Sequence, residues 1–252
     1  MIIPFTYPYH TVVIANGAFP RHPVPLAFLR EASHIICCDG ATEALLEYGT
    51  EPDYIVGDLD SLSQELQQRY SHCLHHDPSQ DYNDLTKAVN FCAEKKWGEI
   101  TILGATGKRE DHSIGNISLL MNYAGYASVQ MITDYGVFMP LLQSGRFECF
   151  AGQQVSIFSL APDTVFTFHG LKYLLTGETI SQWWQGTLNE AIGAEFTIEM
   201  DRGKALVFRE HPEHTPLTGS IDHCQGSAEH PVSGLDPDSG GIHRVNPVRS
   251  LT

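Results

Sequence analysis

Basic side chains are scarce in this chain. Only 15 Lys and Arg stand against 30 Asp and Glu, which gives a formal net charge of −15. A nucleic-acid-binding surface needs clustered Lys and Arg to neutralise backbone phosphates. The composition therefore excludes nucleic acid from the expected partners, and an acidic surface of this kind favours cations.

Long apolar segments are missing too. No run of about 18 apolar residues is present for a membrane span. The first residues, MIIPFTYPYH, lack the basic start and the cleavage pattern of a signal peptide. We therefore expect no membrane association and a cytoplasmic location.

The cysteine and histidine patterns of common metal sites are absent as well. The six cysteines form no CxxC pair, and several lie in apolar runs, where a reduced thiol behaves as a small hydrophobe. The thirteen histidines form no HExxH motif. Neither a zinc site nor a disulfide framework is predicted.

From residue 11 to about residue 133, short apolar runs alternate with helix-like stretches. Runs such as TVVI, HIICC and EITIL are separated by segments of helical periodicity, such as NDLTKAVNFCAEKK. Short buried strands joined by helices predict a parallel sheet with helices on both faces. We predict an α/β domain with a Rossmann-like sheet over residues 1–134.

Beyond residue 135, strands follow one another without long helices between them. Runs such as VFMPLL, QVSIFSLA and KALVFRE are separated by turn signals, which predicts a smaller β-sandwich domain over residues 135–210. The remainder, residues 211–252, is rich in Pro, Gly, Ser, His and Asp and has little apolar periodicity. We expect this tail to be disordered.

Five aspartates follow strand-like runs, namely Asp39, Asp58, Asp60, Asp84 and Asp111. Ligands of parallel sheets bind outside the carboxyl ends of the strands, and Mg²⁺ prefers hard oxygen ligands that it shares with substrate phosphates. The pattern therefore favours a magnesium and phosphate site. Structural alternatives remain, because GDLDS is also a turn sequence and Asp84, after the N-cap residue Asn83, also complements a helix dipole.

The segment GATGKRED, residues 104–111, supplies basic groups beside this acidic set. It is not a Walker motif, because the glycine spacing differs and no Ser or Thr follows the lysine. Lys108 and Arg109 are still suited to phosphate contacts, with Asp111 near the start of a helix. The alternative is an ordinary strand-to-helix turn.

The order of these motifs resembles thiamin pyrophosphokinase. CCDGATEAL, PDYIVGDLDS, QDYNDLTKA and LGATGKREDHSIGN follow one another with plausible gaps. SIFSLAP, GLKYLL and GTLNEA resemble segments of the family's second domain, so that the resemblance spans roughly residues 12–209. Ser79 and Asn83 depart from the pattern, since many members have Asp and Thr there.

The resemblance implies an α/β domain that binds ATP and Mg²⁺, joined to a β-sandwich domain that binds thiamin and forms homodimers with active sites between subunits. It implies transfer of the diphosphate group of ATP to the hydroxyl of thiamin, which gives thiamin diphosphate and AMP. It assigns catalysis to Asp58, Asp60, Asp84 and Asp111, ATP contacts to Asp39, Gln80, Lys108 and Arg109, and metal binding to Asp39, Asp58, Asp60 and Asp111. Asp84 is the expected proton acceptor.

The thiamin contacts implied by the resemblance lie in the segment ISQWWQGTLNE and are Trp183, Trp184, Thr187 and Asn189. A cationic thiazolium ring suits an aromatic face in an acidic pocket. The alternative is that the two tryptophans cover the sandwich core or a dimer interface.

Two other functions stay open. The phosphate-handling motifs do not identify the acceptor, so another hydroxymethyl compound such as a pterin is possible in place of thiamin. A non-catalytic nucleotide-binding regulator on the same fold is the second alternative, although all five aspartates are retained.

Overall fold

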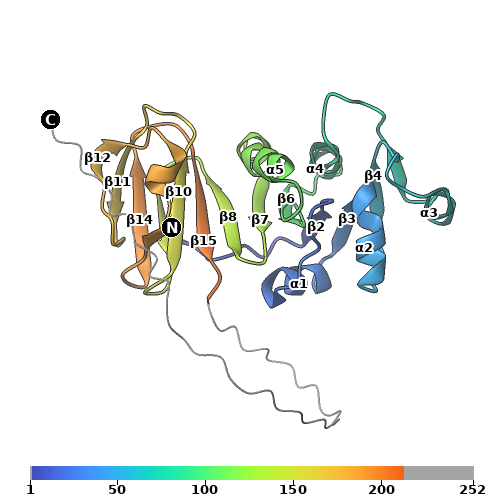
Figure 1. Ribbon diagram of the computed structural model, residues 1–252, viewed down its shortest axis with the longest axis horizontal. Helices are drawn as coiled ribbons and strands as arrows, with labels where there is room; N and C mark the ends of the chain where they lie inside the picture. Colours follow the sequence, from blue (N-terminus) through green and yellow to red (C-terminus); the bar gives the residue numbers. More distant parts are fainter. Residues whose placement is uncertain (1, 213–252) are drawn as a thin grey trace, which may run out of the picture. The chain divides into compact units, whose positions relative to one another are not determined.

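Two β-sheets organise the computed structural model, which describes residues 2–212 (Figure 1). The larger sheet has the order β13 (Asn189–Glu190), β10 (Gln154–Ser159), β15 (Ala205–Glu210), β8 (Gly136–Leu141), β7 (Ser128–Ile132), β6 (Glu99–Leu103), β2 (Thr11–Ile14), β3 (His34–Cys38), β4 (Tyr54–Gly57) and β5 (Leu74–His76). The smaller sheet has the order β1 (Ile2–Ile3), β9 (Gly145–Glu148), β14 (Glu195–Met200), β11 (Val165–His169) and β12 (Thr176–Thr179).

Helices connect the strands of the first half of the chain. They are α1 (Pro23–Arg30), α2 (Thr42–Glu47), α3 (Gln64–Arg69), α4 (Asp84–Glu94) and α5 (Glu110–Tyr123), together with the 3₁₀ turns η1 (Asp39–Ala41) and η2 (Trp183–Gly186). Within residues 2–212, no helix combines the length and the apolar character needed to cross a bilayer. The mixed α/β architecture with a larger sheet and a strand-rich C-terminal part agrees with the fold class expected from the sequence.

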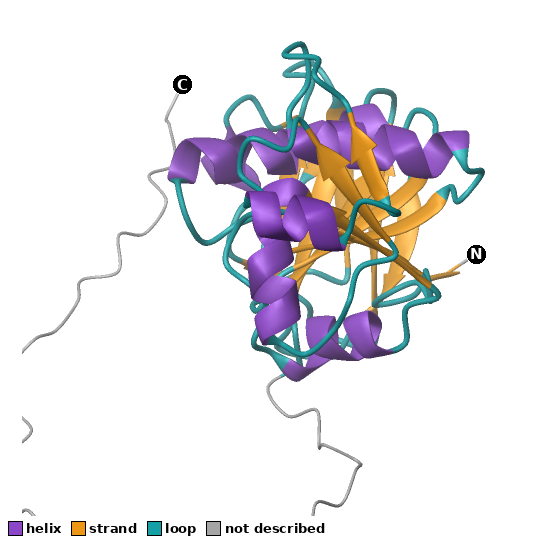
Figure 2. Ribbon diagram, turned by 90° about the vertical axis from the view of Figure 1, so that its right-hand side faces the viewer, coloured by secondary structure: helices purple, strands orange, loops and turns teal. Residues whose placement is uncertain are grey.

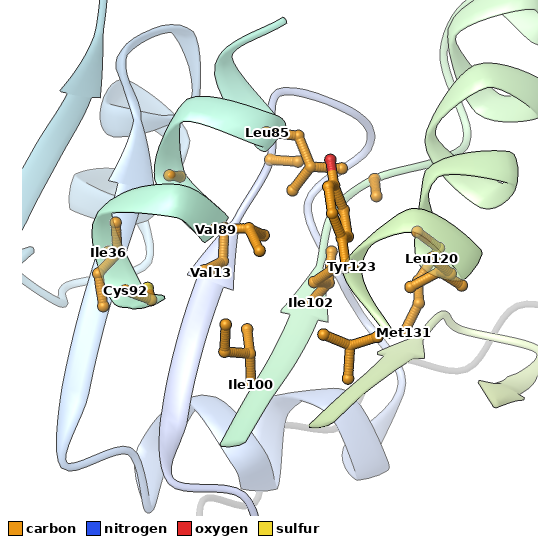
Figure 3. Packing of buried hydrophobic residues seen from close by; sticks show 14 of the residues in the cluster. Val13, Ile36, Leu85, Val89, Cys92, Ile100, Ile102, Leu120, Tyr123 and Met131 are labelled. Atoms are coloured by element: carbon orange, nitrogen blue, oxygen red, sulfur yellow. The ribbon is translucent and has the colours of Figure 1, made fainter. Parts of the chain in front are cut away.

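Strands β5, β4, β3, β2, β6 and β7 all pair in parallel. Successive apolar side chains of these strands pack into two different clusters. Helices cover both faces of the sheet (Figure 2). Val13 packs into the cluster that includes Leu85 and Leu120 from α4 and α5 (Figure 3). Val12 packs instead into the cluster that includes Leu29 from α1. Burial on both faces explains why these strands are continuous apolar runs.

From β8 onward the large sheet becomes antiparallel. β8 pairs with β7 and with β15, and β15 pairs with β10. The smaller sheet shares a core with this part of the large sheet, to which both contribute buried side chains such as Phe147, Val155, Phe166, Phe196 and Val207. The alternation of buried and half-exposed residues along β10 fits a strand with one core face.

The large sheet continues through the predicted domain boundary between residues 134 and 135, because β7 and β8 are paired neighbours. Strand β1, which the sequence did not indicate, joins the smaller sheet by pairing in parallel with β9. The division into two domains stays a prediction. The expected tail, residues 211–252, lies outside the described residues except for its first two.

Arg209 on β15 holds the N-terminal segment against the sheet. Its side chain is fully buried, and its guanidinium donates hydrogen bonds to the carbonyl oxygens of Glu148 (2.8 Å), Pro4 (2.7 Å) and Phe5 (3.0 Å). The guanidinium carbon also lies 5.0 Å from the centre of the Phe147 ring. The planar, five-donor group therefore binds three main-chain carbonyls from two separate segments of the chain.

We predict that Arg209→Met lowers the free energy of unfolding by about 3 kcal/mol, because buried carbonyl groups lose their donors. Chemical denaturation measures the change. Arg202→Met is the matched control, since Arg202 is exposed and forms surface ion pairs with Asp163 and Asp201. Its effect is expected to stay within about 0.5 kcal/mol. Equal effects in the two variants would show that the buried hydrogen bonds do not stabilise the fold.

Candidate functional site

The register of β3 and β4 brings two of the predicted acidic residues together. Cys38 pairs with Val56, so the residues after these strands, Asp39 and Asp58, emerge at the same edge of the sheet. Gly57 makes this approach possible, because a Cβ atom on it would lie 2.8 Å from Cγ of Asp39. A glycine is therefore required where the two strands end.

Asp39, Asp58 and Asp60 form a group of carboxylates. Each offers one oxygen atom, and these three atoms lie within 4.8 Å of one another. Asp39 is 2% exposed; its Oδ1 accepts a hydrogen bond from the Gly40 amide (2.6 Å), and its Oδ2 is buried without a hydrogen-bond partner. Burial, and then the negative charge of Asp84, raise the pKa of Asp39 to about 6. The group is electrostatically unfavourable without a cation.

The backbone between two of these carboxylates is strained. Leu59 has φ +67°, a left-handed conformation that is costly for a leucine. Its side chain packs against the cluster that includes Ile55 and Tyr70. The apolar contact thus holds a conformation that places Asp58 and Asp60 in the same group.

Asp58 is further fixed by neutral and basic partners. Gln80 Nε2 donates to Asp58 Oδ2 (3.1 Å), and Lys87 Nζ lies 3.8 Å from the same oxygen. The hydrogen bond from Gln80 is the main reason that the pKa of Asp58 is lowered. The predicted nucleotide residue Gln80 therefore contacts a predicted metal ligand.

Asp84 begins helix α4, capped by the side chain of Asn83. Its Oδ1 accepts a hydrogen bond from Lys87 Nζ (3.0 Å), so one lysine lies between Asp84 and Asp58. Burial alone would lower the pKa of Lys87, but the hydrogen bond and charge of Asp84 outweigh burial and raise it. The sequence analysis missed Lys87; the signal was a lysine three residues after Asp84, on the apolar face of a helix.

A cavity of about 480 Å³ opens between the strand ends and the helices α4 and α5. Its lining includes Asp58, Gln80, Asp84, Lys87, Lys108 and Arg109. Lys108 Nζ donates to Asn16 Oδ1 (3.0 Å) in the loop after β2, and Asn16 is another lining residue that the sequence analysis missed. The close contact of the loops after β2 and β6 requires Gly17, whose added Cβ would lie 2.4 Å from carbonyl oxygens of residues 104 and 106.

Asp111 does not join the carboxylate group in this structure. Arg109 donates to both of its oxygens, with distances of 3.1 Å from Nε and 2.6 Å from Nη2. This bidentate contact lowers the pKa of Asp111, and both side chains are exposed. Arg109 lines the cavity and Asp111 is not among the lining residues.

Of the predicted thiamin residues, Trp183 and Trp184 lie on η2, Thr187 follows it and Asn189 begins β13. None of them lines the cavity of the same chain. Trp183 and Trp184 are 48% and 65% exposed. The side-chain amide of Asn189 is hydrogen-bonded to the backbone of Tyr173. Its Oδ1 accepts from the Tyr173 N–H (3.0 Å), and its Nδ2 donates to the Tyr173 carbonyl (2.7 Å). Thr187 Oγ1 donates to the carbonyl of Trp184 (2.8 Å).

The donor set at the strand ends fits a magnesium ion. All three residues of the group offer carboxylate oxygen atoms. The buried Oδ2 of Asp39 has no hydrogen-bond partner, so a cation or a donor would stabilise it. Mg²⁺ prefers one or two carboxylates and completes its shell with water and phosphate oxygens. Beside a cavity with basic groups, such a site is suited to phosphate chemistry.

We predict that Gly57→Ala weakens Mn²⁺ binding by at least about tenfold, because the new methyl group displaces the Asp39 carboxylate. Titration of the metal-free protein with Mn²⁺, followed by electron paramagnetic resonance, measures the affinity. Gly98→Ala is the matched control, since nothing lies within 4 Å of its added Cβ. Unchanged Mn²⁺ affinity in Gly57→Ala would show that cation binding does not depend on the position of the Asp39 carboxylate.

We predict that Asp39→Asn stabilises the metal-free protein at neutral pH. The pKa of Asp39 rises from 3.8 to about 6 on folding, so its contribution to stability is present below about pH 4 and is lost as pH rises through about 6. In EDTA at pH 7.5 the variant should exceed the wild type by about 2 kcal/mol, and near pH 4 the two should match. Denaturation at both pH values measures the difference; a pH-independent difference would contradict the raised pKa.

Two family models match consecutive parts of the chain. The model described as "Thiamin pyrophosphokinase, catalytic domain" matches residues 26–132, and the one described as "Thiamin pyrophosphokinase, substrate-binding domain" matches residues 136–208. Together they cover most of the described residues, which agrees with the resemblance seen in the sequence.

Curated relatives carry the same family name. Thiamine pyrophosphokinase 1 of Oryza sativa subsp. japonica is 30% identical over 155 residues, which are 52% of this chain and 58% of the relative. Thiamine pyrophosphokinase of Bacillus subtilis is 33% identical over 114 residues, 43% of this chain and 52% of the relative. The chain therefore spans about half the length of the curated relatives that it matches.

Solved structures agree in fold. Thiamin pyrophosphokinase from Geobacillus thermodenitrificans is 27% identical with a TM-score of 0.65, and the match covers 84% of this chain and 99% of that chain. Thiamin pyrophosphokinase from Candida albicans is 20% identical with a TM-score of 0.68, covers 83% and 92%, and supports the fold alone. With both domain models matched, the chain belongs to the thiamin pyrophosphokinase family.

Proposed function

We propose that this chain transfers the diphosphate group of ATP to the hydroxyl of thiamin, in a Mg²⁺-dependent reaction that gives thiamin diphosphate and AMP. The observation that carries the proposal is the cavity beside the carboxylate group, whose lining combines Asp58 and Asp84 with Lys108 and Arg109. Family membership supports the choice of substrates. On this proposal, the parallel strands form a Rossmann-like layer that binds ATP at their carboxyl ends.

The grouped aspartates would hold the metal. Asp39, Asp58 and Asp60 would coordinate Mg²⁺, which when bound neutralises charge on the phosphate oxygens of the nucleotide. Lys108 and Arg109 would bind phosphate oxygens, and Gln80 would orient Asp58 through its hydrogen bond. These contacts position the reacting groups and need no covalent step on the protein.

Asp84 would accept the proton of the attacking hydroxyl. Its Oδ1 is held by Lys87, so Oδ2 is the oxygen that remains for the substrate. Asp111 would contribute as a further metal ligand after its carboxylate leaves Arg109. Breaking the ion pair between Arg109 and Asp111 costs little free energy, because both side chains are exposed and solvent screens their charges.

The thiamin site would combine two copies of the chain in a homodimer. Trp183, Trp184, Thr187 and Asn189 do not line the phosphate cavity of their own chain, so a second copy would present them to it. The exposed tryptophan rings offer an aromatic face to the thiazolium cation. Asn189 would act through the loop conformation that it holds at Tyr173.

An AMP-release assay tests the proposed function. With Mg·ATP, AMP should appear with thiamin and not with a hydroxymethylpterin, because the second half of the chain matches the family's substrate-binding domain. Asp58→Asn should lower kcat by at least about tenfold, since a metal ligand is lost.

Asp163→Asn is the control for the loss of one carboxylate, because Asp163 is exposed and forms a surface ion pair with Arg202. Its turnover should match the wild type. AMP release with the pterin alone would show that thiamin is not the acceptor. Firm ATP binding without AMP release from either compound would support a non-catalytic, nucleotide-binding regulator instead.

A further inference from the structure

Helix α4 carries a lysine that is buried beside the carboxylate group. The side chain of Lys87 is 2% exposed, although lysine is almost never fully buried without a charged partner. Its Nζ lies 3.0 Å from Asp84 Oδ1 and 3.8 Å from Asp58 Oδ2. One ammonium group therefore bridges the helix and the end of β4.

The bridge connects two residues with different proposed tasks. Asp84 is the proposed proton acceptor, and Asp58 is a proposed metal ligand that also belongs to the group with Asp39 and Asp60. Lys87 is in the first turn of α4, three residues after Asp84, so helix geometry sets the first contact. The second contact reaches a different element, so the ammonium fixes the position of one carboxylate relative to the other.

The same ammonium lies beside a carboxylate that the proposed metal site uses. Asp58 Oδ2 accepts a hydrogen bond from Gln80 (3.1 Å), and the Lys87 ammonium lies 3.8 Å from the same oxygen. A cation at this distance repels a divalent ion and competes with it for the carboxylate. The Lys87 ammonium therefore stabilises the position of Asp58 when no metal is bound, and it lowers the affinity of the carboxylate group for a divalent ion.

We propose that Lys87 is a positioning residue, whose ammonium group aligns Asp84 with Asp58 and competes with the divalent cation for Asp58. The role in turnover rests on the proposed function, and the competition with the cation does not. Removal of the ammonium should therefore tighten metal binding and slow the reaction. A lysine that only fills space would not produce tighter metal binding together with slower turnover when its charge is removed.

The test compares Lys87→Met with the wild type in the full chain. Mn²⁺ titration without nucleotide, read by electron paramagnetic resonance, should show binding at least about threefold tighter in the variant. The kcat for AMP release should fall about tenfold or more, while KM for Mg·ATP should change by less than about threefold, because alignment in the reaction is lost and ground-state binding is kept.

Three further variants control the comparison. Lys87→Gln is also uncharged and should tighten Mn²⁺ binding in the same way, which keeps the test available when the methionine variant does not fold. Lys87→Arg keeps the charge and should keep Mn²⁺ affinity within about threefold of the wild type. Lys95→Met removes a charge from the C-terminal end of the same helix, where Lys95 lies over the Tyr54 ring, and should change neither quantity.

Unchanged or weaker Mn²⁺ binding in the two uncharged variants, with cooperative thermal unfolding retained, would overturn the proposal. The proposal would also be overturned if Lys95→Met tightened Mn²⁺ binding as much as the uncharged Lys87 variants do. A wild type that makes no AMP with thiamin would refute the proposed function, and tighter Mn²⁺ binding by Lys87→Met would then still support the competition at Asp58.

Discussion

The register of the parallel strands is the constraint from which the rest of the structure follows. Cys37 and Cys38 pack on opposite faces of the sheet, into different apolar clusters. A slip of one residue would exchange these faces and would move Asp39 away from Gly57. The apolar packing of both faces therefore sets the positions of the charged groups at the strand ends.

The core thus holds together a group that would not assemble by itself. Asp39 is buried with one unpartnered oxygen, and Leu59 has a left-handed backbone. Both features cost free energy, which the surrounding apolar clusters offset. The hydrogen bond from Gln80 and the charge of Lys87 reduce the repulsion at Asp58 without removing the free oxygen of Asp39. On the proposed function, the protein thus holds the carboxylates in place before the cation binds.

The sequence predicted the strand ends better than the side-chain partners. Asp39, Asp58 and Asp60 were predictable as one group because each follows a buried apolar run, and parallel strands end at the same edge. Lys87 was not, because a lysine on a helix usually reaches solvent and only the packing of α4 on the sheet buries it. Strand β1 is too short for a periodicity signal, and its pairing with β9 depends on a partner far away in the chain.

The separation of the phosphate cavity from the exposed tryptophans connects the fold to the proposed dimer. The two tryptophans of the 3₁₀ turn η2 and the nearby residue Leu188 in the sequence each expose apolar side-chain surface to water. The Trp184 indole already donates to Gln182 Oε1 (2.6 Å), so its ring orientation is set before any ligand arrives. On the proposed function, thiamin bound at these rings is the diphosphate acceptor and needs a nearby site for the donor ATP, which the cavity of a second copy would provide. The position of the exposed aromatic groups, away from the cavity of their own chain, thus supports the proposed dimer.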